Sequence, residues 1–252
     1  MAAHKKAINV LSIGGTDPCS FSGLSIDHKT FLSLGVTGSF ITTVVTAQNT
    51  HKFHAFFSVP PTIIQKQLQS IVEERKIAAL KTGLIPSPKS IYMLGEGIKN
   101  IRAPLVVDPV LGSSTGRSFV RSSLLEGYRR ILLPLATLVT PNLHEAAVLT
   151  GKKLVSSEQI KAAAKQIYAL GPGAVLIKGG HRRGDPIDIL WDGSAYTYFR
   201  SERIGTYPWR GLGCTLSAAI TAFLDQITFQ HQGFDLGIGG DEFQRGNLLH
   251  EA

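Results

Sequence analysis

The sequence predicts an α/β domain in which a mostly parallel sheet carries helices on both faces. Short β-rich runs alternate with stretches of helical periodicity along most of the chain, which is typical of this class. The 252 residues suit one such domain, and 43% hydrophobic against 17% charged residues allows a large core. We expect a single domain over residues 1–225 and a loosely structured, glycine-rich tail over residues 226–252.

Short apolar runs bounded by turn residues predict the strands. The parallel strands are expected at residues 8–13, 39–46, 78–81, 104–108, 138–140 and 174–178. A hairpin is expected at residues 187–191 and 196–199, because the turn dipeptide Asp192-Gly193 separates two β-rich runs. Ligands bind beyond the carboxyl ends of the strands in parallel α/β sheets, and several of these strands end on polar residues.

Helical periodicity and helix-start signals mark the intervening segments. Helices are expected at residues 61–74, 88–99, 158–170 and 213–224. Ser87 is a suitable N-cap for the second of these, and Pro88 suits a first helical position, where the missing N–H costs nothing. Thr140-Pro141 opens a further helix, and residues 14–23 form a loop between the first strand and a helix that carries Asp27.

Charge and cysteine content narrow the classes of function. The formal net charge is +8, but no block of Lys and Arg interleaves with aromatic residues, so we expect small anionic ligands and no nucleic acid. No apolar run reaches the roughly 18 residues of a membrane span. Cys19 and Cys214 lie far apart, and the histidines form no cluster with them, so a reduced, cytoplasmic protein without zinc is expected.

The segment around Gly211-Leu212-Gly213-Cys214 is the strongest candidate site. Two glycines stand one residue apart directly before an apolar helical run, so free N–H groups of a first helical turn can face an anion. Cys214 stands at that helix N-terminus, where a thiol is expected to ionise more readily and to act as base or nucleophile. The simpler interpretation is a tight turn into a buried helix.

Lys178 and Asp108 each end a predicted strand. A lysine followed by Gly179-Gly180 can neutralise phosphate, or it can simply extend its ammonium to solvent at the sheet edge. A carboxylate that ends a very apolar strand is costly unless it is paired or bound to a cation, so Asp108 is a candidate Mg²⁺ ligand. Its simpler role is to cap the next turn.

Asn142 and Glu145 lie in the first turn of the helix that Pro141 opens. Glu145 suits the positive end of a helix dipole, which is the simpler interpretation, and a metal or water ligand is the sharper one. In the loop after the first strand, Asp17 either lines a pocket or caps a turn.

The motifs together resemble the hydroxymethylpyrimidine and phosphomethylpyrimidine kinases of thiamine synthesis, which belong to the ribokinase-like superfamily. The matching segments follow the family's order between about residues 8 and 225. They are residues 13–18, Gly23 with 27–31, 46–50, 81–84, 107–110, 133–137, 140–146, 178–181 and 211–219. The resemblance implies a ribokinase-like three-layer α/β/α sandwich.

The resemblance also implies an activity and roles for residues. The γ-phosphoryl group of ATP would pass to the hydroxymethyl group of a pyrimidine, and then to its monophosphate. Cys214 would be the base, beside Gly211 and Gly213. Mg²⁺ would be served by Asp108 and Glu145, and nucleotide phosphates would be contacted by Lys178, Asn142 and Leu212. The pyrimidine pocket would be lined by Gly15, Asp27, Gln48 and Val110. A homodimer is expected.

Two segments depart from the family pattern. Residues 19–23 read Cys-Ser-Phe-Ser-Gly where the family has Ser-Gly-Gly-Ala-Gly, so Phe21 replaces a glycine. Leu212 replaces a threonine, and Arg210 replaces a histidine. Two alternatives therefore stand beside the pyrimidine kinase: a pyridoxal or pyridoxine kinase, and a catalytically weakened relative that binds a pyrimidine or nucleotide.

Overall fold

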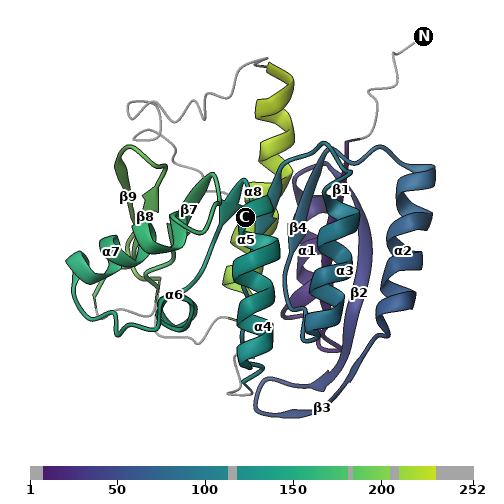
Figure 1. The fold of residues 1–252 in the computed structure, drawn as a ribbon, viewed down its shortest axis with the longest axis horizontal. Helices are drawn as coiled ribbons and strands as arrows, with labels where there is room; N and C mark the ends of the chain where they lie inside the picture. The colour runs from purple at the N-terminus through teal and green to yellow at the C-terminus, as the bar shows by residue number, and fades with distance from the viewer. Residues whose placement is uncertain (1–7, 113–117, 181–183, 205–209, 231–252) are drawn as a thin grey trace.

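A computed structural model describes residues 8–112, 118–180, 184–204 and 210–230, the last six of them by backbone alone. Within these residues one nine-stranded sheet forms the centre of the molecule, in the order β3-β2-β1-β4-β5-β6-β7-β8-β9 (Figure 1). The strands are β1 (Asn9–Thr16), β2 (Thr37–Gln48), β3 (Phe53–Ser58), β4 (Ala79–Thr82), β5 (Leu105–Val107), β6 (Leu138–Val139), β7 (Ala174–Ile177), β8 (Ile187–Trp191) and β9 (Tyr196–Arg200).

The sheet is parallel from β2 to β7, as the alternating sequence pattern predicts. β3 at one edge of the sheet, and β8 and β9 at the other end, run antiparallel to their neighbours. The predicted hairpin is confirmed as β8 and β9, which continue the sheet beyond β7. Parallel strands place all their carboxyl ends at one edge, so residues that follow β1, β2, β5 and β7 meet there.

Helices cover both faces of the sheet, so the predicted α/β class with three layers is confirmed (Figure 1). One face carries α1 (Gly23–Ser33) and α8 (Leu212–Gln230), which pack against each other and against β1 and β4. The opposite face carries α2 (Pro61–Glu74), α3 (Pro88–Ile98), α4 (Ser122–Gly127), the π-helix η1 (Tyr128–Leu132), α5 (Leu133–Leu135), α6 (Leu143–Thr150) and α7 (Ser157–Tyr168). No helix among the described residues is long and apolar enough to cross a membrane.

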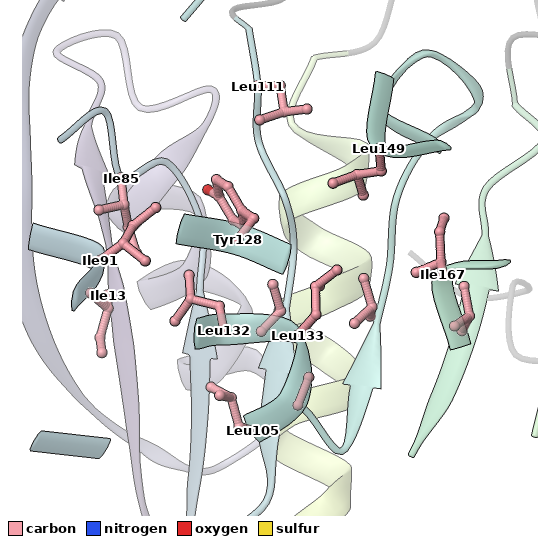
Figure 2. Close-up of a cluster of buried hydrophobic side chains, with 14 of the residues drawn as sticks. Ile13, Ile85, Ile91, Leu105, Leu111, Tyr128, Leu132, Leu133, Leu149 and Ile167 are labelled. Carbon is pink, nitrogen blue, oxygen red and sulfur yellow. The ribbon is translucent and has the colours of Figure 1, made fainter. Parts of the chain in front are cut away.

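The larger core lies between the sheet and the helix-rich face (Figure 2). Strand residues alternate between the two faces, so Leu11 and Ile13 of β1 point into this core, while Val10 points toward α1 and α8. Tyr128 is fully buried in the same core and donates a 3.4 Å hydrogen bond from Oη to the Gly83 carbonyl. One face of the sheet is therefore covered by this larger core, and α8 packs on the other face.

Most predicted elements agree with the structure to within about two or three residues, and α2 agrees at both ends. Ser87 caps α3 as predicted, accepting from the Ser90 N–H. Two segments were not predicted: β3, and the run from α4 through η1 to α5. The second contains Arg129 and Arg130 in a π-helix, whose wider turn breaks the regular helical spacing of apolar residues.

The final helix is longer than predicted. Its backbone continues to Gln230, six residues past the expected end at Leu224 and into the segment expected to be loosely structured. Residues 231–252 lie outside the described residues, as do His181, Arg182 and Arg183.

Candidate active site

The strand period of two places four polar side chains on the face of the sheet that α8 covers. Ser12 and Lys81 are paired neighbours on β1 and β4. Asp108 directly follows β5 and Lys178 directly follows β7. In each case the residue two positions earlier is buried and faces away from the larger core, so Asp108 and Lys178 are placed on that same face. Ser12 lies in the middle of β1 and Lys81 near the end of β4, while Asp108 and Lys178 directly follow their strands and bond to each other, as the expectation for polar strand ends requires.

The turn before α8 has the tight backbone geometry that the glycine spacing predicts. Gly211 has φ +79°, and a Cβ there would overlap the carbonyl oxygen of Phe21. The first helical bond runs from the Thr215 N–H to the Gly211 carbonyl at 2.8 Å, so the N–H groups of residues 212–214 have no partner within the helix. The Leu212 side chain is 62% exposed at this helix start.

Lys178 lies directly beside this helix start. A Cβ built on Gly213 would stand 3.1 Å from Lys178 Nζ, so the ammonium approaches closely only because residue 213 is glycine. Burial by itself lowers the pKa of Lys178, but the charges of Asp108 and Glu145 outweigh it and raise the pKa above its ordinary value. The lysine is therefore charged at neutral pH, as neutralising a phosphate requires.

Asp108 is the centre of a buried polar cluster. Its Oδ1 accepts from Lys178 Nζ at 2.9 Å and its Oδ2 accepts from Ser217 Oγ at 3.1 Å. Thr140 Oγ1 lies 3.5 Å from Oδ1. The predicted need for a partner is met by Lys178, and Ser217 ties the cluster to α8.

Asn142 and Glu145 cap α6, which begins at Leu143, so Pro141 precedes the helix and does not open it, while Glu145 lies in the first turn as the simpler interpretation expects. Asn142 Oδ1 accepts from the Glu145 N–H and Glu145 Oε2 accepts from the Asn142 N–H, both at 2.8 Å. Burial, reinforced by the charge of nearby Asp108, raises the pKa of Glu145 to about 7. Two carboxyl groups thus share one small region of low polarity.

This pair of carboxyl groups fits magnesium bound together with a nucleotide. Mg²⁺ is commonly held by one or two carboxylates, several waters and the substrate's phosphates. A cation near Asp108 and Glu145 would relieve the repulsion that raises the pKa of Glu145. Among the described residues no cluster of three or more His, Cys, Asp or Glu side chains is placed to hold a metal by itself.

The residues expected around the pyrimidine lie at the ends of three strands and in α1. Gly15 is buried on β1 at a shift of register against β2, and Gln48 is half-buried at the end of β2. Val110 is half-buried, two residues beyond Asp108. Asp27 is buried in α1, where Oδ1 accepts from Lys81 Nζ at 2.6 Å and Oδ2 accepts from Ser12 Oγ at 2.7 Å.

Cys214 differs from the sequence expectation in its ionisation. Burial raises the pKa of the Cys214 thiol to about 11, although the charge of Lys81 and the Gly23 N–H lower it. The negative charges of Asp108 and Asp27 oppose ionisation as well. The expectation of a readily ionised thiol is therefore wrong, because the sequence revealed the helix N-terminus but not the burial or the two carboxylates.

The loop after β1 is ordered by Asp17, as the turn-capping interpretation expects. Asp17 Oδ1 accepts from the Cys19 N–H at 2.9 Å and Oδ2 accepts from Ser22 Oγ at 2.8 Å. Phe21 leaves 45% of its surface exposed, and its carbonyl packs on Gly211. Arg210 donates from Nη1 to the Asn49 carbonyl at 2.5 Å. The segment before α8 therefore contacts both the loop after β1 and the residue that follows β2.

Two residues of the cluster were not assigned a role from sequence. Lys81 is fully buried on β4, and Ser217 bonds to Asp108 from the second turn of α8. A lysine inside an otherwise apolar run such as 77–80 is a signal that could have identified the first. Ser217 carries no such signal, because serine is common in helices.

Comparison with known proteins agrees with this architecture. Residues 17–232 match the family model described as phosphomethylpyrimidine kinase. A hydroxymethylpyrimidine/phosphomethylpyrimidine kinase from Streptomyces coelicolor is 39% identical over 215 residues, covering 85% of this chain and 80% of that protein.

Two solved structures are similar over most of their length. Phosphomethylpyrimidine kinase from Clostridium difficile is 34% identical with a TM-score of 0.76, covering 91% of this chain and 93% of that one. An ADP complex of Bacillus subtilis pyridoxal kinase is also 34% identical, with a TM-score of 0.80 and coverage of 87% and 84%. These likenesses confirm the ribokinase-like fold. The chain belongs to the phosphomethylpyrimidine kinase family of phosphotransferases.

Proposed function

We propose that this protein phosphorylates 4-amino-5-hydroxymethyl-2-methylpyrimidine, and then its monophosphate, at the expense of ATP. The observation that carries the proposal is the meeting of the Gly211–Cys214 turn with the Lys178–Asp108 ion pair at one edge of the sheet. Free N–H groups, a charged lysine and a sulfur base stand together there. Phosphoryl transfer needs these parts, since its catalysis is mainly positioning and charge stabilisation.

The phosphoryl acceptor is activated by Cys214. The thiolate removes the proton of the substrate's hydroxymethyl group as that oxygen forms a bond to the γ-phosphorus. The bond from the γ-phosphorus to its bridging oxygen breaks, and ADP leaves with the electron pair. The N–H groups of residues 212–214 and the Lys178 ammonium stabilise the negative charge on the transferring group.

Asp108 and Glu145 would hold the magnesium ion that accompanies ATP, and Asn142 would contact the nucleotide phosphates. The ion supplies charge neutralisation to the phosphates when bound. Lys178 orients Asp108 through its 2.9 Å bond. Glu145, with its pKa raised to about 7, is the carboxyl group whose ionisation the cation would promote.

The pyrimidine lies among Gly15, Asp27, Gln48 and Val110. Carboxylate and amide groups can pair with the amino group and ring nitrogens of a pyrimidine edge, and Asp27 keeps lone pairs that Lys81 and Ser12 do not use. A Cβ on Gly15 would stand 2.7 Å from Val44 Cγ1, so glycine at this position lets β1 and β2 pack closely at the edge of the proposed pocket. These contacts select a hydroxymethyl heterocycle rather than a sugar.

Pyridoxal is the second candidate substrate. The ADP complex of the Bacillus subtilis pyridoxal kinase resembles this chain at a TM-score of 0.80, against 0.76 for the Clostridium difficile phosphomethylpyrimidine kinase. Pyridoxal also carries a hydroxymethyl group on an aromatic nitrogen ring. The two substrates differ in the amino group that we assign to Asp27 and Gln48.

The test is ADP release from purified protein with Mg·ATP and, in parallel, hydroxymethylpyrimidine, its monophosphate or pyridoxal. We expect release with both pyrimidines, and its abolition in Cys214→Ala. Release with pyridoxal alone would move the activity to vitamin B6 salvage. A folded protein that binds ATP but releases ADP with none of the three would overturn the kinase proposal and favour a binding protein.

We further propose that the protein works as a cytoplasmic homodimer whose partners are ATP and a small heterocycle, with no nucleic acid. The absence of a membrane-spanning helix among the described residues is compatible with this. Light scattering of the purified chain at micromolar concentration tests it. A mass near twice 27.2 kDa is expected, and a monomer would refute the dimer.

A further inference from the structure

Beneath the candidate site, α1 and α8 rest on the sheet through a small apolar layer. Val10 of β1 and Ala79 of β4 pack there against Phe31 of α1 and against Ala218 and Ala222 of α8. The small alanines bring α8 close to β4. This layer fixes which residues must face one another at the next level toward the site.

The next level is polar. Two residues further along the strands, the same face carries Ser12 on β1 and Lys81 on β4. On α1, Asp27 precedes Phe31 by four residues, and on α8, Cys214 precedes Ala218 by four. Residues four apart lie on the same face of a helix, so Asp27 and Cys214 face the sheet one turn nearer the helix N-termini. Lys81 therefore faces Cys214 across the interface, as Ala79 faces Ala218.

Lys81 holds a full positive charge in this layer. Its side chain is 1% exposed, and the Asp27 carboxylate lies 2.6 Å from Nζ. Burial lowers the pKa of Lys81, but Asp27, then Cys214 and Asp108, outweigh that effect and raise it above the ordinary value. An ammonium has three N–H donors. Within the described part of the chain only one of them has an acceptor, Asp27 Oδ1.

We propose that Lys81 is a positioning residue whose buried charge, held in place by Asp27, favours the thiolate form of Cys214. The proposal rests on the proposed function in one respect, that Cys214 is the base. It adds a reason why the sulfur of Cys214 can carry the negative charge that a base needs. In this proposal Lys178 stabilises the negative charge of the transferring phosphoryl group, and Lys81 stabilises the negative charge of the Cys214 thiolate.

The charges around Cys214 favour this assignment. From β4, Lys81 favours the thiolate, and from the start of α1 the Gly23 N–H does so too. Asp27 on α1 and Asp108 after β5 oppose it, and Lys178 also interacts electrostatically with the sulfur. Loss of the Lys81 charge would leave Asp27 uncompensated next to the sulfur, so the thiolate would be disfavoured for two reasons.

The test measures the thiol itself and needs no turnover. In a Cys19→Ser background, which removes the other cysteine, the rate of Cys214 alkylation by iodoacetamide is followed between about pH 7 and pH 10. Lys81→Met is expected to slow alkylation about tenfold at every pH in that range, which corresponds to about one pH unit in the thiol's titration. The control Ser12→Ala keeps both charges and is expected to stay within about twofold.

Removing one member of a buried ion pair can prevent folding, so the double variant Lys81→Met/Asp27→Asn is measured as well. It replaces both charges by neutral groups of similar size. Alkylation slower than in the control but faster than in Lys81→Met is expected, because the lysine acts on the sulfur more strongly than Asp27 does. Rates equal to those of the control in folded variants would overturn the proposal.

The readout separates this inference from the proposed function. Slow alkylation in the Lys81 variants, with no ADP release by the parent protein on any substrate, would leave the Lys81–Cys214 coupling standing and refute the kinase. Full kinase activity with alkylation unchanged by Lys81→Met would do the reverse. Where both hold, Lys81→Met should lower kcat about tenfold and leave KM for ATP within about twofold, since the thiol does not bind nucleotide.

Discussion

Lys178 Nζ lies 2.9 Å from Asp108 Oδ1, joining the ends of β7 and β5 directly below the first turn of α8. The pair has two consequences. It makes a carboxylate at the end of an apolar strand tolerable, and it holds a charged ammonium where a helix N-terminus already attracts anions. One ion pair thus joins the stability of the sheet to the phosphate binding that we propose.

Replacement of Lys178 by methionine should lower kcat about 100-fold, because the charge that stabilises the transferring phosphoryl group is lost. Steady-state ADP release measures this. The matched control is Lys165→Met on α7, which removes a lysine that lies 4.5 Å above the Trp191 ring, away from the site. Equal activities of the two variants would contradict the role given to Lys178.

Gly213→Ala should damage catalysis without damaging the fold. The new Cβ would stand 3.1 Å from Lys178 Nζ and push the ammonium aside, while the backbone of Gly213 is outside the left-handed region and accepts alanine. We expect kcat/KM for ATP to fall at least about tenfold with a free energy of unfolding within about 1 kcal/mol of the parent. Chemical denaturation and initial rates give both numbers. A variant with normal kinetics would show that Lys178 does not act from this position.

Turnover should rise with pH. A base must be unprotonated to accept a proton, and burial raises the pKa of Cys214 to about 11. The active fraction therefore grows about tenfold per pH unit from neutrality upward, as long as the thiolate limits the rate. A log kcat profile that is flat between about pH 7 and pH 9 would exclude proton removal by Cys214 as the limiting step.

Glu145→Gln should change how stability depends on pH. The pKa of Glu145 in the folded state is about 7, above the ordinary 4.5 of an unfolded chain. The folded state therefore binds this proton more tightly, and stability is lost as pH rises from about 4.5 to about 7, by about 3 kcal/mol at most. Glutamine has no such loss and still suits the capping box.

The measurement is urea denaturation at about pH 5 and pH 8 without divalent cations. The stability of Glu145→Gln relative to the parent should increase between these values. The control Glu158→Gln removes an exposed glutamate in the first turn of α7 whose pKa is lowered, chiefly by a backbone hydrogen bond. The stability of Glu158→Gln relative to the parent should decrease slightly between these two pH values. An identical response of both variants would refute the burial effect at Glu145.

The sequence predicted the parts of this molecule that depend on local pattern. Apolar runs marked β1, β4, β5 and β7, and the glycines at 211 and 213 marked the start of α8. The polar strand ends Asp108 and Lys178 could be placed at one edge because parallel strands all end there. The position of Glu145 in the first turn of a helix also followed from local sequence, whereas the capping role of Asn142 was not predicted.

What the sequence could not predict depends on contacts between distant segments. β3 pairs with β2, and its residues Phe53 and Phe56 pack against Phe119, far along the chain. The high pKa of Cys214 reflects burial and carboxylates from α1 and β5, none of which is near it in sequence. The position of Lys81 opposite Cys214 can be inferred only once the register of β1 and β4 and the packing of α8 are known.

The most direct test of the central claim is ³¹P NMR of purified protein incubated with Mg·ATP and hydroxymethylpyrimidine. We predict that the ATP γ-phosphate signal declines while a phosphomonoester signal appears on the pyrimidine, followed by a diphosphate, and that Cys214→Ala suppresses both. Unchanged ATP in folded protein that binds the nucleotide, or transfer to pyridoxal but not to the pyrimidine, would contradict it.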